Sequence, residues 1–170
     1  PERDVPDHLH VAVGDIDGDG RPEIIATDAS GQRLIAFEHD GSFKWRSSLL
    51  ETIHWGAPAI ADLDGDGIPE IVIGRQILNS DGTIRWTGTG GRGAHDGGTG
   101  PLSIVADIDL DGVPEVIAGN TAYRPDGTIK WQAPVPDGVN AVGNLNDDPY
   151  AEIVHVSSGS VWLLRHDGQV

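Results

Sequence analysis

The stretch Asp15-Ile-Asp-Gly-Asp-Gly-Arg-Pro-Glu23 decides how this sequence of 170 residues is read, because it recurs along the chain. Its starts lie 47, 45 and 37 residues apart, and each copy is followed by a short β-branched run such as Ile71-Val-Ile73. Self-similarity at such a period indicates a repeat architecture. The three later copies read Asp62-Leu-Asp-Gly-Asp-Gly-Ile-Pro-Glu70, Asp107-Ile-Asp-Leu-Asp-Gly-Val-Pro-Glu115 and Asn144-Leu-Asn-Asp-Asp-Pro-Tyr-Ala-Glu152.

A second element, built on Asp-Gly, repeats in step with the first. Asp-Gly between two apolar runs predicts a tight hairpin, because type I′ turns need positive φ at both central residues. Its tryptophan recurs at one place in the outermost strand, which predicts packing between neighbouring units, with sugar stacking as the alternative. The copies are His39-Asp-Gly-Ser-Phe-Lys-Trp45, Ser80-Asp-Gly-Thr-Ile-Arg-Trp86, Pro125-Asp-Gly-Thr-Ile-Lys-Trp131 and a shorter His166-Asp-Gly-Gln-Val170 without the tryptophan.

Each unit therefore reads as four antiparallel strands in about 45 residues, which is one blade of a β-propeller. We expect an all-β protein with about four blades, and the 24 glycines and 11 prolines agree with its many turns. Propellers close with about four to eight blades, so a piece of a larger propeller is favoured over a closed four-bladed ring. The predicted blades span approximately 9–47, 56–88, 101–133 and 138–170 of a single domain covering 1–170.

The acidic loops have the chemistry of a calcium site. Calcium takes about six to eight oxygen ligands, and Asp-x-Asp-x-Asp-Gly supplies carboxylates at alternate positions that converge when the loop curls. Glycine at position 6 permits the bend, position 7 can offer its carbonyl, and the acid at position 9 closes the shell. In the first loop the predicted ligands are Asp15, Asp17, Asp19, the carbonyl of Arg21, and Glu23.

The same pattern extends the prediction to the other loops. Fourteen of the 27 acidic residues occupy these positions, and so many like charges would repel without a cation. Three calcium sites are expected, with a fourth possible, because the last loop has Asn in place of two Asp residues and lacks the glycine. An EF-hand is excluded, since it needs Glu at position 12 and flanking helices, whereas position 12 is Ala26, Ile73 and Ala118. The further predicted ligands are Asp62, Asp64, Asp66, Ile68, Glu70, Asp107, Asp109, Asp111, Val113, Glu115, Asn144, Asn146, Asp148, Tyr150 and Glu152.

These motifs resemble the FG-GAP or VCBS repeats of the integrin alpha-subunit propeller and of many bacterial surface and secreted proteins. Trp55-Gly56 stands roughly where that family has Phe-Gly, whereas the ninth loop position is Glu in place of the family's usual Asp. The resemblance implies a calcium-stabilised propeller, often of seven blades, in an extracellular, secreted or cell-surface protein used for adhesion or ligand recognition.

Charge and composition exclude other classes. The net charge of −16 makes nucleic-acid binding improbable, and no apolar run is long enough to insert into a membrane. The candidate residues for binding a partner lie in the junctions between units, which are the Gly-rich segment 87–100 and the segment around residue 54. The alternative is that the Gly-rich segment is only a flexible linker. A glycan or protein partner is expected to touch these junctions, through His54, Trp55, Arg92, His95 and Asp96.

Two functions remain open at this point, because fold alone does not establish activity. A non-catalytic extracellular recognition or adhesion module is favoured, since the chain has no cysteine nucleophile and no evident Ser-His-Asp pattern. The alternative is the propeller domain of a secreted carbohydrate-active enzyme such as a polysaccharide lyase. A purely structural spacer is a third possibility.

Overall fold

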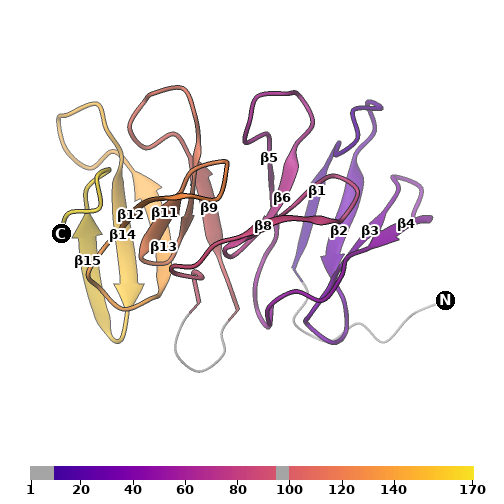
Figure 1. The fold of residues 1–170 in the computed structure, drawn as a ribbon, viewed down its shortest axis with the longest axis horizontal. Helices are drawn as coiled ribbons and strands as arrows, with labels where there is room; N and C mark the ends of the chain where they lie inside the picture. The colour runs from indigo at the N-terminus through magenta and orange to yellow at the C-terminus, as the bar shows by residue number, and fades with distance from the viewer. Residues whose placement is uncertain (1–9, 95–99) are drawn as a thin grey trace.

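The computed structural model describes residues 10–94 and 100–170, and within them every regular element is a β-strand (Figure 1). The strands form four antiparallel sheets that follow one another in chain order. They are β1 (Val11–Gly14), β2 (Glu23–Thr27), β3 (Leu34–Phe37), β4 (Phe43–Arg46), β5 (Ala59–Ala61), β6 (Glu70–Ile73), β7 (Gln76–Leu78), β8 (Ile84–Thr87), β9 (Ser103–Ala106), β10 (Glu115–Ala118), β11 (Thr121–Tyr123), β12 (Ile129–Gln132), β13 (Val139–Gly143), β14 (Glu152–Ser157) and β15 (Ser160–Leu164).

Each of the first three sheets is a simple up-and-down meander of four strands, and the fourth has three. An acidic loop joins the first strand of every sheet to the second, and the Asp-Gly turn follows the third strand. The register between the third and fourth strands shifts beside each turn, at Phe37, Leu78 and Tyr123. The predicted all-β fold of antiparallel propeller blades is therefore confirmed.

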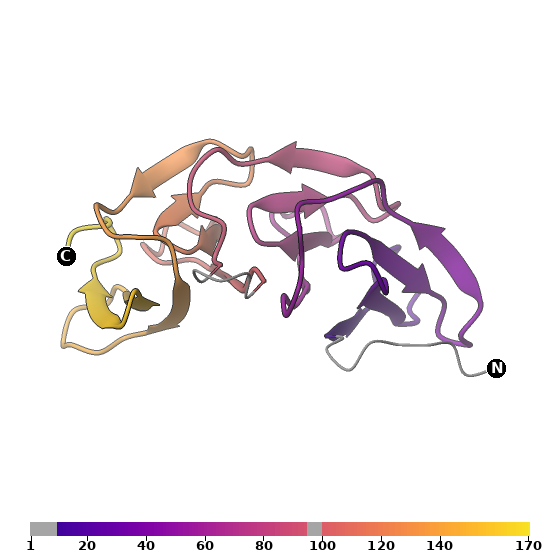
Figure 2. The ribbon, with the colours of Figure 1, turned by 90° about the horizontal axis from the view of Figure 1, so that it is seen from below.

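The four sheets stand side by side along an open arc, and the first and last sheets lie at its two ends (Figure 2). The arc does not close, which agrees with the prediction of a larger propeller over a four-bladed ring. The end sheets expose apolar side chains: Val11 and Val13 are 59% and 61% exposed on β1, and Val161 and Leu163 are 72% and 52% exposed on β15. Equivalent surfaces between the inner sheets are covered.

The cores lie between neighbouring sheets, because the strands alternate their side chains between the two faces of each blade. Ile25 and Leu34 of the first sheet pack with Ile71 and Leu78 of the second, and all four are fully buried. Val72 and Ile77 pack on Tyr123 of the third sheet, and Ile117 of that sheet packs with Ile153 of the fourth. Each blade is thus stabilised chiefly by its neighbours.

The repeating tryptophans pack between blades, as the sequence predicted. Each indole lies against the glycine of the next blade's Asp-Gly turn and donates a hydrogen bond to a carbonyl of that turn. A Cβ atom on Gly82 would come within 2.6 Å of the Trp45 ring, so a side chain there would clash with the indole. The bonds are Trp45 Nε1 to the Ser80 carbonyl at 2.8 Å, Trp86 Nε1 to the Pro125 carbonyl at 2.8 Å, and Trp131 Nε1 to the His166 carbonyl at 2.7 Å.

Candidate metal centres

The first acidic loop curls around its own carboxylates. Asp15 accepts hydrogen bonds from the backbone N–H groups of Gly18 at 2.8 Å and Gly20 at 2.9 Å, and both glycines have positive φ. Asp17 and Asp19 each accept a bond from the backbone two residues further on. These bonds bring one oxygen from each of the three aspartates within 4.8 Å of one another.

The second loop repeats this geometry, and the third varies it. Asp62, Asp64 and Asp66 converge like their counterparts in the first loop. In the third loop the converging set is Asp107, Asp109 and Glu115. The third loop has Leu110 where the first two have glycine, and Leu110 keeps the positive φ of Gly18 and Gly65, at 61°. The difference lies in the N–H of Asp111, which donates to Asp107 at 3.1 Å, whereas the same N–H in the first two loops donates to the aspartate at position 3.

The glutamate at position 9 lies beneath each loop. Its Oε2 atom accepts a hydrogen bond from the backbone N–H of loop position 2, and its side chain is almost wholly buried. Burial raises the pKa of Glu23, Glu70 and Glu115 above the ordinary value of a glutamate. The four bonds are Ile16 N to Glu23 at 2.9 Å, Leu63 N to Glu70 at 3.0 Å, Ile108 N to Glu115 at 3.2 Å and Leu145 N to Glu152 at 2.8 Å.

Position 7 holds Arg21, Ile68, Val113 and Tyr150, whose backbone N–H groups donate to the aspartate at position 5. These donations fix the peptide that precedes each of these residues. The use of their carbonyls as metal ligands stays a prediction.

A basic side chain from the fourth strand reaches each of the first three loops, and sequence reasoning missed it. Lys44 Nζ lies 2.6 Å from Asp17, and its hydrogen bond holds the pKa of Asp17 below the usual range. Arg85 binds both Asp64 and Glu70. These residues stand directly before Trp45 and Trp86, so the repeated basic-Trp pair was the signal that could have revealed them.

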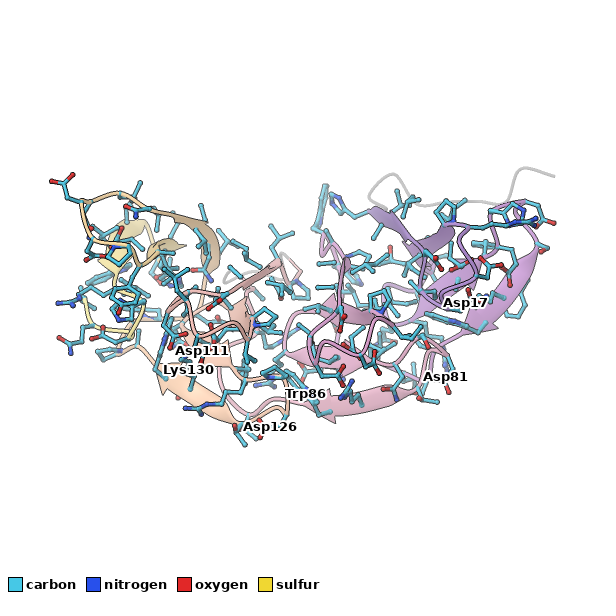
Figure 3. The ribbon with its side chains drawn as sticks, turned by 90° about the horizontal axis from the view of Figure 1, so that it is seen from above. Asp17, Asp81, Trp86, Asp111, Asp126 and Lys130 are labelled. Carbon is cyan, nitrogen blue, oxygen red and sulfur yellow. The ribbon has the colours of Figure 1, made fainter. Side chains whose placement is uncertain are left out.

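Lys130 does the same in the third loop, where Figure 3 shows it beside Asp111. Its Nζ atom lies 2.7 Å from Glu115 and 4.0 Å from Asp111, and it also pairs with Asp109. Each of the first three loops therefore contains one internal positive charge against four carboxylates.

The fourth loop is held by amide groups. Asn146 Nδ2 donates to Glu152, and Asn144 Nδ2 donates to the carbonyl of Asp148 at 2.6 Å. Asn146 thereby bonds the same glutamate oxygen that a basic side chain bonds in the second and third loops. This loop has two carboxylates at the predicted ligand positions, Asp148 and Glu152, where each of the other loops has four.

The donor set of the first three loops fits a hard divalent cation. All candidate side-chain ligands are carboxylates, which calcium prefers. In the first loop the buried Oε1 atom of Glu23 has no hydrogen-bond partner, which is costly unless a cation or donor satisfies it. Counting the internal lysine or arginine, each loop keeps a net charge of about −3 for a cation to neutralise.

The junction candidates are brought together only in part. Arg92 lies 3.1 Å from Glu51 and donates to the carbonyl of Thr52 at 2.8 Å, so it ties the junction after β8 to the junction after β4. Trp55 has a φ of 65° and is 49% exposed, and the ring of His54 lies next to Gly31. His95 and Asp96 lie outside the described residues.

None of the described residues belongs to a helix long and apolar enough to cross a bilayer.

Comparison with known proteins supports the repeat and the fold. Residues 7–73 match a family model described as FG-GAP-like repeat, which confirms the resemblance over that part of the chain. A search of curated protein sequences gave no match. The V. cholerae biofilm matrix protein Bap1 is similar in structure, with 29% identity, a TM-score of 0.74 and coverage of 95% of this chain and 27% of Bap1.

Two rhamnogalacturonan lyases share the fold. The exotype enzyme YesX has a TM-score of 0.68 at 18% identity, and YesW has a TM-score of 0.63 at 20% identity. Each alignment covers 95% of this chain and 30% of the lyase. The chain thus spans less than a third of the length of Bap1 and of these two lyases.

Proposed function

We propose that this chain is a calcium-binding part of a β-propeller that serves extracellular recognition or adhesion and catalyses no reaction itself. The observation that carries the proposal is the convergence of carboxylate oxygens within 4.8 Å in each of three loops at equivalent places in three consecutive blades. A single acidic cluster is common on protein surfaces, but here the cluster recurs at the same loop positions in three blades, which a chance cluster would not do.

Calcium would be held by Asp15, Asp17, Asp19 and Glu23 in the first loop and by the corresponding side chains in the next two. A bound ion would neutralise the carboxylates and be coordinated by several of them at once. Because position 1 follows the first strand of a blade and position 9 begins the second, these residues would connect the two strands through the ion. Neutralised loops would brace the first two strands of each blade, while the partner binds elsewhere.

The proposal includes an extracellular location. Extracellular calcium modules have dissociation constants of about 10⁻⁴–10⁻³ M, so sites of this weak class would be filled outside the cell. The likeness to a biofilm matrix protein at 29% identity supports this location.

The junctions supply candidate contacts for a partner. Half the surface of Trp55 faces solvent, so it is the junction residue best placed to contact a glycan or protein. Arg92 serves that surface indirectly, since its bonds to Glu51 and Thr52 hold the two junctions together.

The alternative is the propeller domain of a secreted carbohydrate-active enzyme, and the fold shared with two lyases favours it as the second candidate. The two functions are separated by incubating the purified chain with rhamnogalacturonan and other polysaccharides in calcium. Binding to an immobilised polysaccharide without new chain ends supports the recognition module. Cleavage by this chain, abolished in heat-denatured protein, would overturn it in favour of the enzyme.

A further inference from the structure

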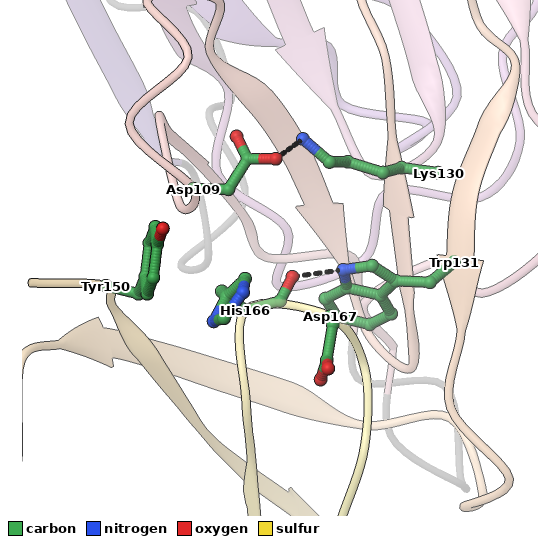
Figure 4. A pocket seen from close by; sticks show the side chains of 6 residues that line it. All are labelled: Asp109, Lys130, Trp131, Tyr150, His166 and Asp167. Carbon is green, nitrogen blue, oxygen red and sulfur yellow. Dashed lines mark hydrogen bonds and ion pairs between the residues drawn. The ribbon is translucent and has the colours of Figure 1, made fainter. Parts of the chain in front are cut away.

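A cavity of about 370 Å³ lies between the third and fourth blades, away from the junctions (Figure 4). It is bounded by β12, by the acidic loops of both blades and by the last Asp-Gly turn. Its volume falls at the lower end of the range of small-molecule sites, which is about 300–1,000 Å³. The lining residues are Asp109, Lys130, Trp131, Tyr150, His166 and Asp167.

The cavity has a stacked aromatic wall. The rings of Tyr150 and His166 lie 4.2 Å apart at an interplanar angle of 29°. The carbonyl of His166 accepts the indole N–H of Trp131 at 2.7 Å, so the turn that carries the wall is fixed to the preceding blade. Three ring systems are thus held around one opening by contacts that exist before any ligand arrives.

The equivalent positions in the other blades lack this wall. Tyr150 occupies position 7 of its loop and His166 precedes its Asp-Gly. These two places are Arg21 and His39 in the first blade, Ile68 and Ser80 in the second, and Val113 and Pro125 in the third, so no other blade has two aromatic rings there. The aliphatic, hydroxyl and proline side chains there keep the repeat intact. The aromatic pair is therefore not required by the blade-to-blade packing, and it sets this groove apart from the other two between described blades.

Polar groups stand at the rim of the same cavity. Asp167 accepts a backbone hydrogen bond from Gln169 at 3.2 Å, which orients its carboxylate. Lys130 binds Asp109 across the upper side of the opening (Figure 4). The rim therefore offers the carboxylate of Asp167 as an acceptor, beside the Asp109–Lys130 ion pair and the aromatic rings.

We propose that this groove binds a sugar ring of a neutral glycan, and this deepens the recognition function proposed above, on which it rests. Pyranose rings present apolar C–H faces that pack on aromatic side chains and hydroxyl groups that donate to carboxylates. Tyr150 and His166 form the stacking wall, while Asp167 accepts hydroxyl hydrogen bonds.

Electrostatics selects the class of sugar. Asp167 is the lining carboxylate that no calcium loop uses, whereas Lys130 is already paired with Asp109 and Glu115. The whole chain carries a net charge of −16. The negative charge would repel the carboxylate of a uronate at this site, whereas a neutral sugar would meet no electrostatic repulsion.

The experiment compares the wild-type chain with a groove exchange, Tyr150→Ile together with His166→Ser, which installs the side chains of the second blade. The probes are methyl glycosides of glucose, galactose, mannose and rhamnose, with galacturonate as the charged comparison, titrated at millimolar concentration in calcium and followed by NMR. We expect at least one neutral glycoside to bind and the exchange to weaken it at least tenfold. The control Ser80→Ala changes the position equivalent to His166 in the groove between the first and second blades and should leave binding unaltered.

A second measurement does not depend on any variant. The indole N–H signal of Trp131 should shift when the neutral glycoside is added to the wild-type chain, whereas that of Trp45 should not. The proposal is overturned if no neutral glycoside binds, if galacturonate binds as tightly, or if sugar binding leaves the Trp131 signal in place. The calcium dependence of melting is measured without sugar, so failure of the groove and failure of the calcium module are told apart.

Discussion

The acidic loops of the first three blades and the loop of the fourth have the same backbone plan but balance their charge differently. In the second loop Arg85 enters from β8 and binds Asp64 and Glu70. In the fourth loop the amide of Asn146 makes the bond to Glu152 from within the loop itself. Both arrangements leave negative charge: the second loop has four carboxylates at the ligand positions against one arginine, and the fourth has two carboxylates there with no basic partner.

The difference shows how a repeat can keep its shape while it loses a metal site. The buried glutamate bonds the loop backbone in all four blades, so this structural role is independent of any ion. The aspartates at positions 1 and 3 supply the extra charge, and these are the positions that are Asn144 and Asn146 in the fourth loop. We therefore expect calcium to bind the loops of the first three blades and not the loop of the fourth.

Removing calcium should have the largest effect. With a dissociation constant of about 10⁻⁴ M and about 2 mM free calcium, each site adds roughly 1.8 kcal/mol to the free energy of unfolding. Three sites give on the order of 5 kcal/mol, comparable to the stability of a whole domain. The melting temperature, followed by circular dichroism, should fall by many degrees in EDTA and recover with calcium.

Magnesium is the matched control for that experiment. It demands regular octahedral geometry and keeps its waters, so it should restore little of the lost stability. An identical melting curve with calcium and with EDTA would rule out the proposed sites.

Single substitutions should separate the two kinds of loop. Asp64→Ala should remove about 1.8 kcal/mol of the stabilisation that calcium gives, because one site of three is lost. Asn146→Ala leaves a buried oxygen of Glu152 without its donor and should cost about 1–3 kcal/mol, equally with calcium and with EDTA. Urea unfolding of both variants in both conditions measures this. A calcium-dependent loss in Asn146→Ala as large as that in Asp64→Ala would contradict the comparison.

The fourth loop can be given the missing charge. Asn144→Asp with Asn146→Asp restores four carboxylates, so the stabilisation by calcium should rise by about 1.8 kcal/mol above that of the wild-type chain. The calcium stoichiometry from isothermal titration should rise from three to four. Should both quantities stay unchanged, Pro149 at the glycine position, and not charge, is what disables this loop.

Removing an internal cation should have the smallest effect. Lys130→Gln deprives Asp109 and Glu115 of their counter-charge in the calcium-free chain, whereas bound calcium would supply it. The difference in unfolding free energy between calcium and EDTA should widen by about 1 kcal/mol. Arg124→Gln is the control, because Arg124 donates to the carbonyl of Ile129 and touches no acidic loop. A narrower difference in Lys130→Gln would mean that the lysine helps to hold the ion.

Much of this arrangement could be predicted from the sequence, because it depends on spacing. The alternate aspartates must curl together when glycines allow positive φ, and the Asp-Gly turns fix the hairpins. The tryptophans recur with the blade period, which placed them between blades. Asp111 shows the limit: it has the right spacing, yet its N–H bonds Asp107 where the first two loops bond position 3, and Asp111 does not join the converging set.

Contacts between elements could not be predicted in this way. The ion pair of Arg92 with Glu51 joins two junctions that lie far apart in the sequence, and no spacing indicates it; contact of Arg92 with a partner stays a prediction. Tyr150 and His166 come from a loop and a turn, and nothing in their spacing announces that their rings stack. Such pairs depend on how one hairpin folds back over another.

The most direct test of the calcium assignment is a crystal structure of the chain grown in calcium, with the ions located by their anomalous scattering. We predict one peak among the carboxylates of each of the loops 15–23, 62–70 and 107–115, and none in the loop 144–152. An ion in the fourth loop with none in the second, or no ion in any loop at millimolar calcium, would contradict it.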